Sequence, residues 1–401
     1  MRIEDEFSEI AKNLKASEIR ELLKLTQQPD IISFAGGLPN PESFPVDTIK
    51  KIIDSLLETE GARILQYGST EGVNSFRDAL SEMMRNKYGV SVTKDNILVT
   101  AGSQQALYLL AKIFINPGDK VIIEAPTYIG ILTAFQSYKP EYKEIEMDDD
   151  GMRTDLLEET LRSMRKEGDK PKMIYTIPTF QNPAGVTMSL DRRKHLIELS
   201  EDYDVLIVED DPYGELRYSG EPLPLLKSLD RNHNVIYLGT FSKILSPGFR
   251  MAHLIAHEEI IHKAVLAKQG IDLCTNTVGQ FVAREYISRG YLENHIPKII
   301  ELYKRKRDLM LDMLEDHFPD GVKWTKPDGG MFLWVTLPDG MDAEKMFHRA
   351  IQHKVAYVIG SAFFPRRNHK NTMRLNFTYP TDEQIKVGVV RLSKVIREEL
   401  P

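Results

Sequence analysis

The feature that most constrains the fold is the alternation of short apolar runs with helical segments between residues 96 and 240. Runs such as 120–124, 205–208 and 234–238 are rich in β-branched residues and too short for helices, which is typical of buried strands. Strands that alternate with helices form a parallel sheet covered by helices on both faces. After about residue 275 the pattern becomes long amphipathic helices and turn-linked strands, which predicts a smaller α+β domain.

Length, charge and cysteine content limit the class of protein. A chain of 401 residues with 42% hydrophobic residues exceeds the usual size of one domain, so we expect two. A net charge of −7, with acids and bases mixed, argues against a nucleic-acid groove and against an anionic membrane surface. No apolar run approaches the roughly 18 residues of a membrane helix. The single cysteine, Cys274, excludes an internal disulfide and suits a reducing cytoplasm.

Two predicted turns carry residues that suit a phosphate and a carbonyl group. Ser103 and Gln104 follow the expected strand 96–100 and begin a helix, whose first backbone amides can face an anion. The turn at 239–250 places hydroxyl groups beside Lys243 and ends in an arginine, and such groups can hold a phosphate. A lysine amine there can form a Schiff base with a carbonyl cofactor such as pyridoxal phosphate. Taken alone, the same turn could be a solvated loop.

Further polar side chains stand at or near the ends of other expected strands, where α/β proteins bind ligands. Tyr128 could contact a ligand or serve only packing, and Asp210 could pair with a ring nitrogen or cap a loop. Asn182 lies between two prolines, and we predict a cis bond at Asn182–Pro183. Arg374 interrupts an apolar strand, so we expect it to be half-buried with an anionic partner, either an internal carboxylate or a substrate.

Other motifs exclude competing chemistries. His257 and His262 are five residues apart, which places them on different sides of a helix rather than together as zinc ligands. With no cysteine cluster either, we expect no metal site. The chain has no phosphate-binding loop of the NTPase type and no dinucleotide Gly-x-Gly-x-x-Gly motif, which weakens kinase and dehydrogenase interpretations.

Together, these motifs resemble the fold-type I, class I/II aminotransferases that depend on pyridoxal phosphate. The resemblance runs from Ala16 to the C-terminus and is strongest to the branch with aromatic, kynurenine and 2-aminoadipate aminotransferases. It implies a large domain over 46–290, with a mostly parallel seven-stranded sheet flanked by helices. It also implies a smaller α+β domain over 291–401, joined by the N-terminal helix and loop of 1–45, which also cover the pocket. A homodimer with a shared active site is implied as well.

The resemblance also implies a role for each candidate residue. Lys243 is the Schiff-base lysine and proton carrier, Asp210 pairs with the pyridine nitrogen, and Arg374 receives the substrate α-carboxylate. The other residues implied around the cofactor are Ser103, Gln104, Tyr128 (which stacks on the ring), Asn182, Tyr213, Thr240, Ser242, Arg250 and, from the partner subunit, Tyr67. The further residues implied at the substrate are Asn182, Gly37 and Arg20. The chain departs from many relatives at Ala252–His253, which puts local packing in doubt.

The implied reaction moves the amino group of an aromatic, kynurenine or 2-aminoadipate-type amino acid to 2-oxoglutarate, by way of pyridoxamine phosphate. Two alternatives remain open. One is a β-lyase on the same scaffold. The other is a non-catalytic effector-binding module of a DNA-binding regulator, although only about 15 residues precede the helix expected at Ser17, too few for a separate domain.

Overall fold

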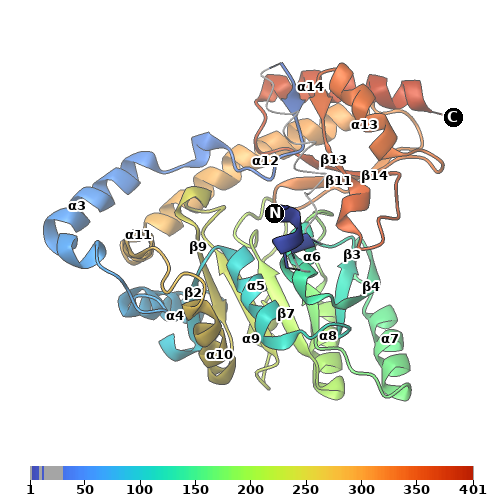
Figure 1. The fold of residues 1–401 in the computed structure, drawn as a ribbon. Helices are drawn as coiled ribbons and strands as arrows, with labels where there is room; N and C mark the ends of the chain where they lie inside the picture. Colours follow the sequence, from blue (N-terminus) through green and yellow to red (C-terminus); the bar gives the residue numbers. More distant parts are fainter. Residues whose placement is uncertain (1, 9–10, 13–29, 401) are drawn as a thin grey trace.

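The protein was analysed as a computed structural model that describes residues 2–8, 11–12 and 30–400. Helices cover both sides of a central sheet, and a smaller part of the chain lies at one end of it (Figure 1). The helix expected at Ser17, which carries Arg20, lies outside the described residues.

The central sheet is mostly parallel, which confirms the predicted fold. Its strands, in spatial order, are β2 (Ile97–Ala101), β9 (Met251–Ile255), β8 (Val235–Thr240), β7 (Leu206–Asp211), β6 (Met173–Thr176), β3 (Lys120–Ala125), β4 (Glu141–Asp148) and β5 (Gly151–Met152). The strands from β8 to β4 run parallel, whereas β9 is antiparallel to both of its neighbours. The sheet thus has one strand more than the seven implied by the resemblance if the two-residue β5, which pairs antiparallel with β4, is counted.

Alternate residues of the inner strands face opposite helical layers, so strands such as β3, β6 and β8 are continuous apolar runs. In β3, Val121 and Ile123 pack against α5 (Ser103–Phe114), α6 (Ile129–Phe135) and α10 (Glu258–Gln269). Ile122 faces the other side, where the helices are α7 (Thr154–Lys166), α8 (Leu190–Tyr203) and α9 (Leu226–Leu229). The remaining helices of this part are α3 (Val46–Ile64), α4 (Asn74–Tyr88) and α11 (Thr277–Ser288).

The smaller part is an α+β unit, as predicted. Its antiparallel sheet has the order β10 (Lys323–Trp324), β11 (Phe332–Thr336), β14 (Thr372–Asn376) and β13 (Val358–Ile359). The expected hairpin is formed by β10 and β11. Its helices are α12 (Tyr291–His317), α13 (Ala343–Gln352) and α14 (Asp382–Glu399), and the short 3-10 helices of the chain are Ile3–Glu6, Pro41–Ser43, Lys94–Asn96, Gln136–Tyr138, Pro247–Phe249 and Gly360–Phe363.

The N-terminal loop joins the smaller part through a second sheet. Strand β1 (Ile32–Ser33) pairs in parallel with β12 (Val355–Ala356). This pairing accords with the expectation that the first residues belong with the C-terminal ones, although the domain limits themselves stay a prediction. No helix among the described residues is long and apolar enough to cross a membrane.

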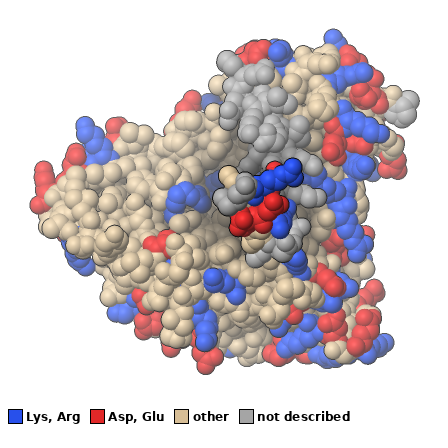
Figure 2. Space-filling model, viewed as in Figure 1, with Lys and Arg blue, Asp and Glu red and all other residues tan. Residues whose placement is uncertain are grey.

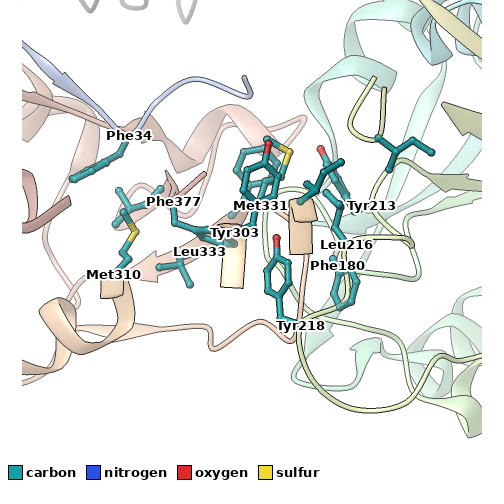
Figure 3. Close-up of a cluster of buried hydrophobic side chains, with 14 of the residues drawn as sticks. Phe34, Phe180, Tyr213, Leu216, Tyr218, Tyr303, Met310, Met331, Leu333 and Phe377 are labelled. Carbon is teal, nitrogen blue, oxygen red and sulfur yellow. The ribbon is translucent and has the colours of Figure 1, made fainter. Parts of the chain in front are cut away.

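One hydrophobic cluster connects the two parts of the chain. Figure 3 shows Phe180, Tyr213 and Tyr218 from the larger part in the same cluster as Met331 and Leu333 from the smaller part, with Met331 between Leu333 and Tyr213. The hairpin turn before β11 is also hydrogen-bonded to the segment after Tyr213, since the amide of Tyr218 donates to the Asp328 carbonyl at 2.7 Å. The loops between the two parts are therefore held by a shared core.

Candidate active site

The carboxyl ends of four neighbouring parallel strands bring the predicted residues to one edge of the sheet. Tyr128 follows β3, Asn182 follows β6, Asp210 lies in β7 and Lys243 follows β8. Strands that run in the same direction end at the same edge, which is where such sheets bind ligands. The structure therefore gathers side chains that are spread over more than a hundred residues of sequence.

Lys243 is half-buried and contacts the N-terminal loop. Its Nζ donates a hydrogen bond to the carbonyl of Gly37 at 3.0 Å. Desolvation, and then the cationic Arg374 and Arg250, lower the pKa of the Lys243 amine to about 8. A lowered pKa raises the fraction of neutral amine near pH 7, which is the form that attacks a carbonyl carbon.

Asp210 is a buried carboxylate with one oxygen available. Only 2% of the residue is exposed, and Oδ2 accepts a hydrogen bond from the Tyr175 hydroxyl at 2.8 Å. Oδ1 has no hydrogen-bond partner among the described residues. Burial raises the pKa of Asp210 to about 7. A buried acceptor of this kind suits a protonated ring nitrogen, and the residues fit the expected pyridoxal phosphate at this point.

Arg374 is buried, at 7% exposed, and not half-buried as predicted, because its side chain is enclosed between the two parts of the chain, and it has no carboxylate partner among residues 30–400. Its Nη1 donates to Asn182 Oδ1 at 2.8 Å, its Nη2 donates to the Ala35 carbonyl at 3.0 Å, and Nε has no partner there. The guanidinium carbon lies 4.0 Å from the centre of the Phe332 ring. Burial lowers the pKa of Arg374 to about 10. Of the two partners left open by the sequence, a substrate carboxylate is the one that this arrangement favours.

Asn182 is hydrogen-bonded on both sides within the site. Asn182 Nδ2 donates to the Tyr213 hydroxyl at 3.2 Å, so this amide connects Tyr213 with Arg374. The Asn182–Pro183 bond is cis, as predicted, and so is the Ala125–Pro126 bond, which was not predicted.

The start of α5 and the turn after β8 form a cradle for a phosphate. An ideal Cβ at Gly102 would lie 2.1 Å from Arg250 Nη2, so the guanidinium is close to the helix start. Ser103 Oγ is buried and has no partner among the described residues. The Thr240 and Ser242 hydroxyls are 3.0 Å apart. A helix N-terminus, a guanidinium and three hydroxyls, of which that of Ser103 has no described partner, together match the needs of a phosphate group.

Tyr128 and Gln104 are fixed next to this cradle. Gln104 Nε2 donates to the Gly130 carbonyl at 2.9 Å, which ties α5 to the start of α6. A Cβ at Gly130 would lie 2.1 Å from the Tyr128 ring, so the absence of a side chain at Gly130 leaves room for the ring. Gln104 thus contacts protein, and only its position beside Ser103 supports the predicted cofactor role.

The cradle gives a prediction with a control at a second positive-φ glycine. Gly102 has φ +81° and ψ 161°, a region that essentially only glycine adopts, whereas Gly89 has φ +67° and ψ 17°; alanine therefore strains the backbone at both positions, by up to about 3 kcal/mol at Gly102 and about 1 kcal/mol at Gly89. At Gly89 an added Cβ meets nothing within 4 Å, whereas at Gly102 it displaces Arg250. We expect Gly102→Ala to weaken pyridoxal phosphate binding by roughly tenfold or more, the scale of a lost charge-assisted contact. Titration of both apoproteins with the cofactor measures this, and equal affinities would contradict the assignment of the cradle.

Two predicted residues do not meet the site within this chain as described. Tyr67 is 81% exposed, and its role from a partner subunit stays a prediction. Arg20 lies outside the described residues.

The departure at Ala252–His253 is accommodated in β9. The His253 ring is buried, and burial lowers its pKa to about 4. A Cβ at Gly239 would lie 2.4 Å from its Nε2. A neutral histidine therefore fills this space.

The sequence did not identify Tyr175 as part of the site. Its hydroxyl is the described partner of Asp210, yet it lies in the middle of the buried strand β6. A tyrosine within a buried apolar strand needs a hydrogen-bond partner for its hydroxyl, and this requirement was the signal that the sequence offered. Phe332 below Arg374 gave no such signal.

Comparison with known proteins agrees with this geometry. A model of the family "Aminotransferase class I and II" matches residues 30–392. The chain is 57% identical over 394 residues to aromatic-amino-acid aminotransferase 1 of Thermococcus litoralis, which covers 98% of this chain and 94% of that protein. It is 40% identical to the 2-aminoadipate transaminase of Thermus thermophilus, over 98% of this chain and 96% of the relative.

A solved structure is equally similar. The kynurenine aminotransferase of Pyrococcus horikoshii, crystallised with PMP and kynurenine, is 54% identical and superposes with a TM-score of 0.98 over 100% of this chain and 99% of its own. The family match and these relatives extend over nearly the whole sequence. This chain therefore belongs to the class I and II aminotransferases, which are transferases that use pyridoxal phosphate.

Proposed function

We propose that this enzyme transfers the amino group of an aromatic, kynurenine or 2-aminoadipate-type amino acid to 2-oxoglutarate, with Lys243 as the residue that bonds the cofactor. The observation that carries the proposal is the amine of Lys243, with its lowered pKa, at the edge of the central sheet where Asp210 also lies, and with Arg374 of β14 as a cationic neighbour. The names of the similar proteins supply the three donor types.

The chain's own residues account for the proton transfers. When bound, pyridoxal phosphate supplies a carbonyl group and an electron-withdrawing ring. With its pKa of about 8, Lys243 Nζ can bond that carbonyl and, once released, accept the proton from the donor's α-carbon. Asp210 Oδ1, free of other described partners, holds the proton on the ring nitrogen. Lys243 Nζ then donates this proton to the cofactor side of the amine. With the 2-oxo acid acceptor, Lys243 carries out the same two proton transfers in the opposite order.

Binding and orientation fall to the surrounding groups. Arg374 receives the α-carboxylate common to donor and acceptor, and Asn182 fixes the guanidinium by its 2.8 Å hydrogen bond. Tyr128 stacks on the ring, and Tyr213 joins Asn182 at the ring oxygen. The groups that hold the phosphate are those of the cradle, namely Ser103, Thr240, Ser242 and Arg250, together with the neighbouring Gln104.

Substrate choice is tested by steady-state assays with 2-oxoglutarate and each donor. We expect glutamate to form with phenylalanine, kynurenine or 2-aminoadipate. We further propose that Arg20 binds the side-chain carboxylate of the dicarboxylic substrates. Arg20→Ala should then raise the KM for 2-oxoglutarate and 2-aminoadipate by roughly 10- to 100-fold and leave that for phenylalanine unchanged, since only the former lose a charged partner. Absence of glutamate with every donor would contradict the proposal, and pyruvate released from β-substituted amino acids would favour the lyase.

We also propose a homodimer in which Tyr67 of the partner subunit completes the phosphate cradle. Large apolar side chains are exposed on two adjacent segments, with Leu65 69% and Leu273 51% exposed. The Thr277 hydroxyl, which donates to the Gln66 carbonyl at 3.1 Å, joins these segments. The face formed by α3, α4 and α11 carries few charged side chains (Figure 2). A monomeric mass in light scattering would contradict the homodimer. We also propose a cytoplasmic location.

A further inference from the structure

Glu124, near the end of β3, is a buried carboxylate that takes no part in the chemistry proposed above. The residue is 1% exposed. Oε1 accepts a hydrogen bond from the Thr176 hydroxyl, and Oε2 accepts from the Ile177 amide at 3.2 Å and from Gln181 Nε2 at 3.0 Å. No cation is paired with Glu124 among residues 30–400, and burial raises its pKa to about 7. Burial of a carboxylate costs free energy, so we asked what its three hydrogen bonds hold in place.

Gln181, the neighbour of Glu124, is completely buried, and its side-chain amide makes three hydrogen bonds. Besides the bond to Glu124, Nε2 donates to the Pro126 carbonyl at 2.8 Å. Oε1 accepts from the Ala184 amide at 2.8 Å. One side chain thus joins the segment after β3 to the loop after β6.

These two segments carry residues of the active site on either side of the cofactor position. Pro126 stands two residues before Tyr128, and Gln181 stands directly before Asn182. Asn182 in turn orients Arg374 by its 2.8 Å hydrogen bond. A change in the distance between the segments would therefore shift the ring-stacking group relative to the group that orients the carboxylate-binding arginine.

We propose that Glu124 and Gln181 form a buried clamp that fixes the Asn182 loop to the Tyr128 segment, so that both are positioning residues for the cofactor and the substrate carboxylate. The proposal rests on the functions assigned above to Asn182 and Tyr128. Because the proposal concerns hydrogen bonds and not charge, a variant that keeps these bonds can be compared with one that removes them.

A conservative and a disruptive substitution of Glu124 distinguish loss of the clamp from loss of general stability. In Glu124→Gln, the amide oxygen can still accept from Ile177 and Gln181, and the new NH2 can donate to the Thr176 hydroxyl, which turns round. Glu124→Leu fills a similar volume but leaves the Ile177 amide and one Gln181 hydrogen without acceptors. The first variant should keep the clamp and the second should open it.

Glu209 provides the control. It is as buried as Glu124, lies in β7, and accepts from the amides of Leu226 and Lys227 at 2.8 Å, with its pKa likewise raised to about 7 by burial. Its hydrogen bonds lie at α9, and none of them reaches the Asn182 loop. Glu209→Leu should therefore destabilise the protein without moving that loop.

The test measures amide hydrogen exchange of residues 177–186 in the apoprotein, together with kcat and KM for the amino donor in the holoenzyme. We expect Glu124→Leu to speed exchange in this segment and to raise KM by roughly tenfold or more. Glu124→Gln should stay close to wild type in both, and Glu209→Leu should leave exchange in this segment unchanged.

Unaltered exchange of 177–186 in Glu124→Leu would overturn the clamp, whatever the activity. Faster exchange with an unchanged KM would overturn its positioning role and contradict the function assigned to Asn182, so the two failures can be told apart. If Glu124→Leu does not fold, Gln181→Met serves instead: it keeps the volume and removes the bond to Glu124 together with those to Pro126 and Ala184, so it also opens the clamp and is read in the same way.

Discussion

Lys243→Ala should lower turnover by roughly ten-thousand-fold or more, while the apoprotein still binds pyridoxal phosphate. The variant loses the only lysine amine that the described structure places at the converging strand ends, where its pKa is about 8. The phosphate cradle and the Asp210 carboxylate do not depend on this side chain, so non-covalent binding of the cofactor should persist. Turnover and cofactor titration on the same preparation measure the two effects.

A lysine buried elsewhere serves as the control for Lys243→Ala. Lys227 lies in α9 and pairs with Asp230 at 2.9 Å, away from the site. Lys227→Met should lower the free energy of unfolding and leave turnover per folded molecule near that of the wild type. Retained turnover in Lys243→Ala would contradict the role of Lys243 as both the attachment point and the proton carrier.

Asp210→Asn should lower kcat by roughly a thousandfold, with the cofactor still bound. Asparagine keeps the shape and can still accept the Tyr175 hydrogen bond, which is 2.8 Å long in the wild type. It carries no negative charge, however, and cannot hold a proton on the ring nitrogen. The cofactor then loses most of its capacity to accept electrons during the reaction.

Asp211→Asn is the matched control because it changes the adjacent residue of the same strand. Asp211 faces the opposite side of the sheet, where it accepts from the Tyr237 hydroxyl at 3.1 Å and from the Gly214 amide at 3.0 Å. Its loss should affect stability and leave kcat within a few-fold of wild type. Equal losses of kcat in the two variants would mean that Asp210 acts through the fold and not at the cofactor.

Much of the fold was predictable because its information is local. Buried strands such as β3, β7 and β8 are short apolar runs, and parallel strands end at one edge, so Asp210 and Lys243 could be expected to lie close together. Strands β4 and β9 were missed. Charged residues alternate along β4, as in a solvated segment, and β9 follows directly on the 239–250 turn.

The contacts that support the site were not predictable, since they depend on how distant segments align. The bond from Tyr175 to Asp210 requires the register of β6 against β7, and the bond from Gln181 to Glu124 joins residues 57 positions apart. Likewise, the sequence left the partner of Arg374 open. Only the position of Arg374 between Asn182 and the Phe332 ring shows a cation with no described carboxylate.

The most direct test of the proposed function is a half-reaction without any 2-oxo acid. Holoenzyme is mixed with phenylalanine, kynurenine or 2-aminoadipate, and the visible absorption of the bound cofactor is followed together with release of the corresponding 2-oxo acid. We expect the visible band to bleach, with a stoichiometric amount of 2-oxo acid released per subunit, and to return when 2-oxoglutarate is added. A band that shifts with the amino acids but never bleaches would contradict transamination and would instead indicate a ligand-binding module.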